Sequence, residues 1–544
     1  MNQALILAKA RLFTGKFRQS NAGNVAVIFA IAIVPIIGFI GAAVDYSRVN
    51  NARTAMQTAL DSAALMISKD AAGLTAAQIT TKAQGYFNAL YVHPEASGIS
   101  VSALYTPNTG SGATIVMTGS GTMPTTFLKV AGYPQIDFSV GSTTTWGSAK
   151  LRVALALDNT GSMSSDGKIG ALRTAATNLI NQLSATSTTD GDVMISIVPF
   201  AKDVNMGSAN YNQNWIDWTD WEAEAPDLQG SSNKPSNWSS YGPGSNCPWS
   251  MRTDGFTCVS GPGSTTAVSK IPSSGTNKGM ICPGPDPTSS YGYAYHFLIN
   301  GCYDSVGTSS YTHTWRPNSH ALWSGCLTDR TQSYDTLNTA PAPGTTATLF
   351  PAEQYYENNE SYCTTGNSPQ LQSIIPLSYD WSNLKSNIST MQPTGGTNQP
   401  IGLAWGWQSL MQSAPFNAPA ENANYTYNRV IILLSDGLNT EDRWPSYGNG
   451  STQNTCAGNV GCIDARQKIL CDNIKAVIDP KTNKPAYTIY TIQVNTGSPA
   501  DPTSSVLQYC ASDASKFTQV TSANQIISTF DSIGTSLSKL RVAR

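Results

Sequence analysis

The pattern of apolar and polar positions in the first part of the chain predicts helices followed by a small β region. Residues 23–44 carry no charged side chain, and a helical period of apolar positions continues from there to Ile67. A second helical period covers about 76–89. Residues 98–148 then contain β-branched runs separated by glycine and proline. We therefore predict a long helix with an amphipathic second half, a shorter helix and a few strands.

The uncharged segment 23–44 has the length of a membrane anchor. As a helix it extends about 33 Å, which is enough to cross a bilayer. Residues 1–22 contain four basic side chains and no acidic one, which predicts a cytoplasmic amino terminus and an extracytoplasmic remainder. A cleaved signal peptide is the alternative, but its apolar run is usually shorter, and no A-x-A site ends this one. We therefore predict an uncleaved single-pass anchor, followed by a helix and small β region over 45–149.

Strand and helix patterns alternate in two later stretches of the chain. The first stretch contains an apolar strand at 151–157, a helix at 168–184 and a strand at 193–200. In the second stretch we expect a short strand near 374–377, a helix near 381–391, a helix after Gly402, a strand at 429–436, a helix at 464–478, a strand at 487–494 and a helix at about 523–540. This alternation predicts an α/β domain formed by residues 150–205 and 373–544.

Residues 206–372 interrupt the α/β pattern. They are rich in Trp, Tyr, Ser, Gly, Asn and Pro, contain six cysteines and show no sustained period. A compact domain does not ordinarily contain a structureless loop of this length. We interpret the segment as an insertion held by disulfides, whose aromatic side chains form either its own core or a contact surface.

Composition points to an oxidising compartment. Charged residues make up 12% of the chain, against a usual quarter, and the net charge of -2 gives no basic field for nucleic acid. The ten cysteines lie between Cys247 and Cys510, mostly in loop-like sequence, which favours disulfides. Zinc is the alternative, but the chain has no C-x2-C pair and its four histidines show no ligand spacing. The cysteines thus agree with an extracytoplasmic location.

Oxygen-bearing side chains follow two of the predicted strands. The candidate metal ligands are Asp158, Thr160, Ser162, Thr397 and Asp436. Because parallel strands end at the same edge of a sheet, these loops can converge there. Oxygen ligands suit a hard divalent cation, namely Mg2+, Mn2+ or Ca2+. Taken alone, the first loop is also compatible with an ordinary turn and helix cap, and Thr394 is an alternative to Thr397.

The motifs around these residues resemble those of a von Willebrand factor A domain. Asp-x-Thr-x-Ser follows a buried strand, Gly-Gly-Thr precedes a helix, and a later strand ends in Ser-Asp-Gly. The resemblance implies a doubly wound, Rossmann-like α/β fold with a metal-ion-dependent adhesion site. Asp158, Thr160 and Ser162 match the first motif of that site, Thr397 its threonine and Asp436 its last aspartate. In that family a partner's carboxylate completes the metal shell, so the implied function is binding.

A second resemblance covers both ends of the chain. Asn24-Val-Ala-Val-Ile-Phe-Ala, Gly41-Ala-Ala-Val-Asp45-Tyr and the stretch from Ala52 are similar to TadG-type (TadE/TadG-like) proteins of the bacterial tight-adherence, or Flp, pilus system. The sequence around Cys471 and Cys510 is similar too, and we expect these two to pair, with Cys456–Cys462 as the second expected disulfide.

The resemblance also bears on processing of the anchor. Pseudopilins that are cleaved in the Flp system carry a glutamate five residues after the cleavage glycine. Counted from Gly23, that position is Ile28, so we do not expect cleavage by a prepilin peptidase.

These observations predict a protein of the bacterial inner membrane with its bulk outside the cytoplasm. It would assist assembly or anchoring of an adhesive pilus by binding protein partners through the metal site. The alternative is a surface adhesin that binds an external ligand directly through the metal site and the insertion. A metal-dependent hydrolase is disfavoured, because no general base with a matched partner and no G-x-S-x-G motif is present.

Overall fold

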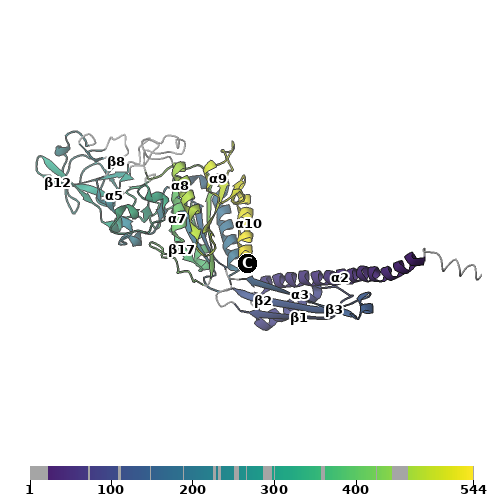
Figure 1. Ribbon diagram of the computed structural model, residues 1–544. Helices are drawn as coiled ribbons and strands as arrows, with labels where there is room; N and C mark the ends of the chain where they lie inside the picture. Colours follow the sequence, from purple (N-terminus) through teal and green to yellow (C-terminus); the bar gives the residue numbers. More distant parts are fainter. Residues whose placement is uncertain are drawn as a thin grey trace, which may run out of the picture. The chain divides into compact units, whose positions relative to one another are not determined.

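The computed structural model divides the chain into two compact units, Met1–Ser148 with Val542–Arg544, and Ala149–Arg541 (Figure 1). The residues described are 23–542 without 72–73, 108–111, 147–148, 188, 225–227, 231–233, 250–255, 265, 286–296, 299, 357–361, 424 and 444–462. The expected pair Cys456–Cys462 and residues 1–22 therefore lie outside the described residues. Each unit is described by itself.

The first unit joins two helices to an antiparallel sheet. Its elements are α2 (Gly23–Asp70), α3 (Ala76–Leu90), β1 (Ser97–Thr106), β2 (Ala113–Pro124) and β3 (Gln135–Trp146), with strand order β1-β2-β3. The apolar side chains of α2 are exposed over much of the stretch from Val27 to Val44. In the described part of the chain, α2 is the one helix long and apolar enough to cross a membrane.

The second half of α2 forms the core of this unit. Ala52, Met56 and Leu60 are fully or almost fully buried among side chains of α3 and the sheet, as the helical period predicts. A glycine on β2 permits this close packing, because a Cβ on Gly119 would lie 2.8 Å from the Met56 sulfur. Helix α3 begins with a reciprocal capping box, in which Thr75 and Gln78 each bond the other's backbone N–H.

The second unit is built on a mixed eight-stranded sheet. Its order is β14-β6-β5-β4-β18-β21-β22, with β17 paired antiparallel to β5. These strands are β4 (Ala149–Asp158), β5 (Val193–Phe200), β6 (Val204–Asn205), β14 (Cys326–Leu327), β17 (Ile375–Ser378), β18 (Thr426–Ser435), β21 (Tyr487–Val494) and β22 (Phe517–Val520). The pairs β5–β4, β4–β18, β18–β21 and β21–β22 are all parallel. Numbered along the chain without the two short strands β6 and β14, the order is 3-2-1-4-5-6, and its direction reverses between β4 and β18.

Helices cover both faces of this sheet (Figure 1). One face packs against α4 (Lys168–Ser184), α6 (Trp381–Thr390) and α10 (Ala523–Val542), and the other against α7 (Gln399–Gln408), α8 (Ile463–Ala476) and α9 (Ser505–Cys510). Along β4, Val153 and Leu155 contact the first group while Ala154 and Ala156 contact the second. Because β4 is buried on both sides, its sequence is continuously apolar instead of alternating.

Residues 206–372 contain a five-stranded antiparallel sheet with strand order β13-β12-β10-β8-β9. Its strands are β8 (Phe256–Val259), β9 (Ala267–Val268), β10 (Met280–Pro285), β12 (Gly301–Gly307) and β13 (Tyr311–Pro317). Disulfides Cys247–Cys258 and Cys282–Cys302 hold it together. Its core includes Trp249 and Tyr303.

Smaller elements complete the second unit. They are β7 (Ile216–Asp217) paired with β15 (Phe350–Pro351), β11 (Phe297–Leu298) with β16 (Tyr355–Tyr356), β19 (Ile478–Asp479) with β20 (Lys484–Pro485), and the short helix α5 (Thr219–Glu222).

At its base, the segment 206–372 is not a separate insertion, because it shares the core of the α/β sheet. Trp215, Trp221 and Phe350 belong to the same core as Trp405 of α7, and β14 pairs with β6 of the main sheet. The described Trp side chains of the segment are buried or half-buried, so they act mainly as core. The segment is therefore continuous with the α/β core.

Two further disulfides are described. Cys326–Cys363 closes the base of the inserted segment, and Cys471–Cys510 joins α8 to α9. The second confirms the pairing expected from the sequence. All eight cysteines within the described residues are in disulfides, so none of these offers a thiolate to zinc.

Candidate metal centre

Strands β4 and β18 bring the two predicted carboxylates to the same edge of the sheet. The two strands are parallel neighbours with Leu157 opposite Leu434, so Asp158 and Ser435 occupy equivalent positions at the strand ends. The Ser435 hydroxyl donates to Asp158 Oδ2 at 2.6 Å. Asp436 follows directly. The strand order reverses between these two strands, which is the position at which doubly wound sheets commonly bind ligands.

Four of the five predicted side chains form one hydrogen-bonded series. Thr160 N–H donates to Asp158 Oδ1 at 2.8 Å. The hydroxyls of Thr160 and Ser162 lie 3.0 Å apart, and Ser162 donates to Asp436 Oδ1 at 2.6 Å. Asp158, Thr160 and Asp436 are buried, whereas Ser162 is exposed, so the series reaches the surface at Ser162.

Thr397 lies on the loop beside this series. Gly161 N–H donates to the Gly395 carbonyl at 2.9 Å, and Thr394 N–H donates to the Asn159 carbonyl at 2.6 Å. Thr397 itself is held by Thr440, whose hydroxyl accepts its N–H at 2.6 Å. Among the hydrogen bonds of the described residues, none joins the Thr397 or Thr394 side chain to the other four.

The site holds two neighbouring carboxyl groups and one lysine. Burial, and then the nearby Asp436 carboxylate, raise the pKa of Asp158 to about 7. The Lys168 ammonium lies 2.5 Å from Asp436 Oδ2 and is itself buried. Lys168 was missed from the sequence, although it is the first residue of the predicted helix 168–184. Its single charge balances one of the two carboxylates.

The spacing of the site's oxygens bears on its fit to Mg2+. Six oxygens at about 2.1 Å from the ion place neighbouring ligand oxygens roughly 3.0 Å apart. The Thr160–Ser162 separation of 3.0 Å matches this value, and the Ser162–Asp436 separation of 2.6 Å is shorter because the hydroxyl donates a hydrogen bond. The donor set of two carboxylates and hydroxyls fits a hard divalent cation.

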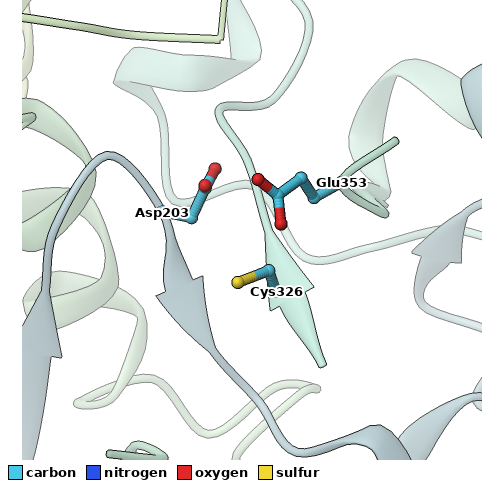
Figure 2. A group of neighbouring side chains, drawn as sticks. All are labelled: Asp203, Cys326 and Glu353. Carbon is cyan, nitrogen blue, oxygen red and sulfur yellow. The ribbon is translucent and has the colours of Figure 1, made fainter. Parts of the chain in front are cut away.

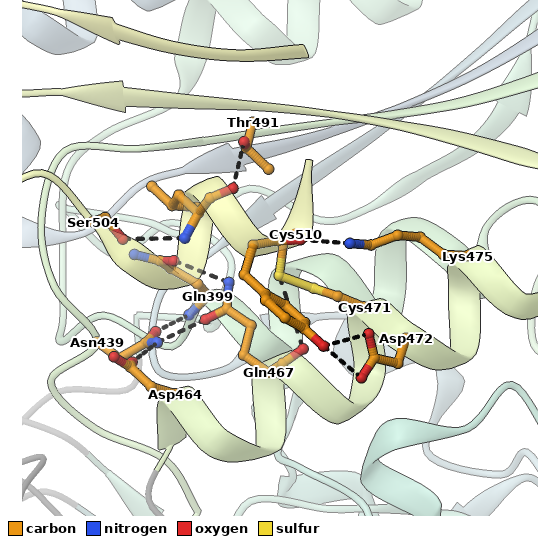
Figure 3. The surroundings of a disulfide bond; sticks show 12 residues. Gln399, Asn439, Asp464, Gln467, Cys471, Asp472, Lys475, Thr491, Ser504 and Cys510 are labelled. Atoms are coloured by element: carbon orange, nitrogen blue, oxygen red, sulfur yellow. Dashed lines mark hydrogen bonds between the residues drawn. A yellow bond between two sulfur atoms is a disulfide. The ribbon is translucent and has the colours of Figure 1, made fainter. Parts of the chain in front are cut away.

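A buried amide network supports the loop after β18 (Figure 3). Gln399 Nε2 donates to Ser435 Oγ at 3.2 Å and to the Gly437 carbonyl at 2.9 Å, while Gln467 donates to Gln399 Oε1 at 3.1 Å. Asn439 donates to Gln467 and accepts Gln399 N–H. These side chains were missed because amides far apart in sequence meet only through the packing of α7 and α8.

A second group of potential ligands lies elsewhere in this unit (Figure 2). Within the described residues, Asp203, Cys326 and Glu353 are the one set of three acidic, histidine or cysteine side chains with ligand atoms within 4.8 Å of one another. Cys326 is bonded to Cys363 and so provides no thiolate. Burial raises the pKa of Asp203, which accepts a hydrogen bond from Tyr362 at 3.0 Å. We therefore interpret this group as a buried carboxyl pair.

Comparison with known families matches the amino-terminal helix. The family described as putative Flp pilus-assembly TadE/G-like matches residues 23–66. These residues comprise the apolar segment of α2 and the buried turns that follow it. No curated protein matches the chain.

Comparison with solved structures gave weak similarities. The pilus adhesin SpaC from Lactobacillus rhamnosus GG has a TM-score of 0.32 at 10% identity, over 83% of this chain and 36% of SpaC. The vWF domain of the type V pili tip protein Mfa5 from Porphyromonas gingivalis has a TM-score of 0.30 at 10% identity, over 73% of this chain and 97% of that domain. The pilus adhesin RrgA from Streptococcus pneumoniae has a TM-score of 0.28 at 12% identity, over 81% and 50%. TM-scores of this size do not establish a common fold.

Proposed function

We propose that the chain is a membrane-anchored, extracytoplasmic binding protein of a Flp/Tad-type pilus system, acting in assembly or anchoring of the pilus. The family match over residues 23–66 supports the pilus system and the anchor. The disulfides support an oxidising compartment. The second unit is proposed as a von Willebrand factor A domain that holds its partner without breaking a bond.

The hydrogen-bonded series from Asp158 through Thr160 and Ser162 to Asp436 carries this proposal. It gathers oxygen ligands from two strands at the reversal point of the sheet, where doubly wound proteins bind ligands. We propose that these four side chains, together with Thr397, hold Mg2+ or another divalent cation. When bound, the ion supplies a positive centre to which a carboxylate of a protein partner can attach.

The buried tryptophans of the inserted segment weigh against the adhesin alternative, in which these aromatic side chains form a recognition surface. The polar position at the surface end of the series is Ser162. We therefore place the contact with the partner at this edge of the main sheet.

The proposal is tested by copurification of partners from the native membrane with and without a chelator. Asp158→Ala should abolish Mg2+ binding measured by calorimetry, and should abolish both metal-dependent partner recovery and pilus-dependent attachment. Far-ultraviolet circular dichroism should show that the fold is kept.

The matched control is Asp304→Ala, which removes a part-exposed carboxylate of β12 paired with Arg316. This variant should bind Mg2+ and partners as the native chain does. Normal attachment by Asp158→Ala would show that the metal site has no part in the function. The membrane anchor is tested separately, by whether the chain resists extraction from the membrane.

A further inference from the structure

An exposed apolar loop joins β2 to β3 in the first unit. Phe127, Val130 and Tyr133 are 44%, 92% and 66% exposed, and Ala131 and Pro134 between and beside them are exposed as well. Lys129 is exposed and is the one charged residue between residues 124 and 135. So much exposed apolar surface on a ten-residue stretch indicates a contact with something apolar.

Hydrogen bonds and packing hold this loop against one turn of α2. The Asp45 carboxylate accepts the backbone N–H groups of Thr126, Phe127 and Leu128 at 3.0, 2.8 and 2.8 Å. The Phe127 ring packs on Gly41, where an added Cβ would lie 2.4 Å from it. The loop therefore lies beside residues 41–45 of the helix.

Residues 41–45 are the end of the apolar segment. With the spanning stretch taken as residues 23–44, Gly41 lies three residues before its end, or roughly 5 Å at the rise of an α-helix. This is the depth at which a bilayer changes from hydrocarbon to headgroups. Aromatic side chains and lysine are the residues that favour this zone.

We propose that loop 125–134 is a second membrane contact, which inserts Phe127, Val130 and Tyr133 into the outer interfacial zone of the bilayer beside the anchor. The occupant of this surface is lipid, because the exposed apolar surface of the loop continues that of the helix through the Phe127–Gly41 contact. Lys129 then reaches the phosphates. The inference rests on the proposed membrane anchor.

The test uses the full chain reconstituted in vesicles of phosphatidylethanolamine and phosphatidylglycerol. Val130→Cys, and separately Tyr133→Cys, are labelled with an environment-sensitive fluorophore under conditions that keep the disulfides. Lipids brominated near the headgroup serve as quenchers. We expect a blue shift and a loss of emission at both positions.

The matched control is Thr106→Cys, an exposed position at the far end of the same sheet. It lies opposite Thr114, ten residues along β2 from Pro124, or roughly 33 Å away. It should keep aqueous emission without quenching. Equal aqueous emission at 130, 133 and 106 would overturn the proposal. A blue shift at 130 and 133 without quenching by brominated lipid would also overturn it, because it would mean that protein covers the loop. Resistance of each labelled chain to carbonate extraction shows independently whether the anchor holds.

Discussion

Each unit buries an aspartate that belongs to one of the sequence motifs described above, but the two carboxylates are held in different ways. Asp45 of the first unit accepts three backbone N–H groups and lies 3.9 Å from Arg48. Asp158 of the second unit accepts one N–H and one hydroxyl, and it faces a second carboxylate, Asp436. Both side chains are almost fully buried.

We interpret Asp45 as a structural carboxylate, and Asp158 as a ligand under the proposed function. Backbone amides that already point at a carboxylate satisfy its charge permanently, so nothing further needs to bind. Two carboxylates placed together keep an unsatisfied charge, which the protein tolerates when a cation neutralises it. In the second unit, Lys168 supplies one positive charge, and the proposed metal ion would supply the remainder.

The largest expected effect concerns Asp329, another buried carboxyl group of the second unit that lies near a second carboxylate. Burial, and then the nearby Asp442, raise the pKa of Asp329 to about 8 from 3.8. A raised folded-state pKa gives stability that is complete below pH 3.8 and is lost as the pH rises through about 8. Between low and high pH, the stability of Asp329→Asn should therefore rise by roughly 6 kcal/mol relative to that of the native chain, measured by denaturant unfolding at several pH values. A constant difference across pH would contradict this.

The next effect tests the structural role of Asp45. Asp45→Ala leaves three N–H groups without their acceptor, and we expect a loss of about 3 kcal/mol in local stability. Amide hydrogens of Thr126, Phe127 and Leu128 should then exchange roughly a hundredfold faster. Asp158→Asn is the contrasting variant, and in the presence of a chelator it should keep or raise stability. Equal destabilisation by both changes would remove the distinction between the two aspartates.

The smallest effect concerns Lys168. Its ammonium would compete with the proposed metal ion for Asp436, because two positive charges repel at short range. Lys168→Met keeps much of the side-chain length and should raise Mg2+ affinity about tenfold, or ~1.4 kcal/mol, in calorimetric titration. Lys385→Met, at a half-buried lysine of α6 that donates a hydrogen bond to Asn181 Oδ1, is the control and should leave affinity unchanged. Weaker binding by Lys168→Met would mean that the ammonium supports the ligands instead.

Much of the fold follows from periodicity where an element is long and buried. The continuous apolar runs predict β4, β5 and β21, and the helical period predicts α4 at its observed bounds, Lys168–Ser184. The sequence does not predict short elements such as β22 with four residues and α9 with six, because an element of that length is too short to display a period. The strands of residues 206–372 were missed too, since disulfides and aromatic packing replace regular alternation there.

The residues of the candidate site also divide into those that the sequence predicts and those that it does not. Asp158 and Asp436 stand at strand ends and can be found from the sequence. Ser435, Gln399 and Gln467 depend on which strands and helices become neighbours, which a single sequence does not specify. Whether a metal binds, and whether Thr397 or Thr394 serves it, stays a prediction.

If the chain anchors a pilus as proposed, the continuity of α2 has a mechanical consequence. The helix runs without interruption from Gly23 to Asp70, and its one proline, Pro35, lies within the apolar stretch. With that stretch in a bilayer, a bend at Pro35 falls inside the membrane, and no flexible joint separates the anchor from the core of the first unit. Tension on this unit would therefore be transmitted along the helix and tilt the anchor in the bilayer. A flexible linker would absorb it instead.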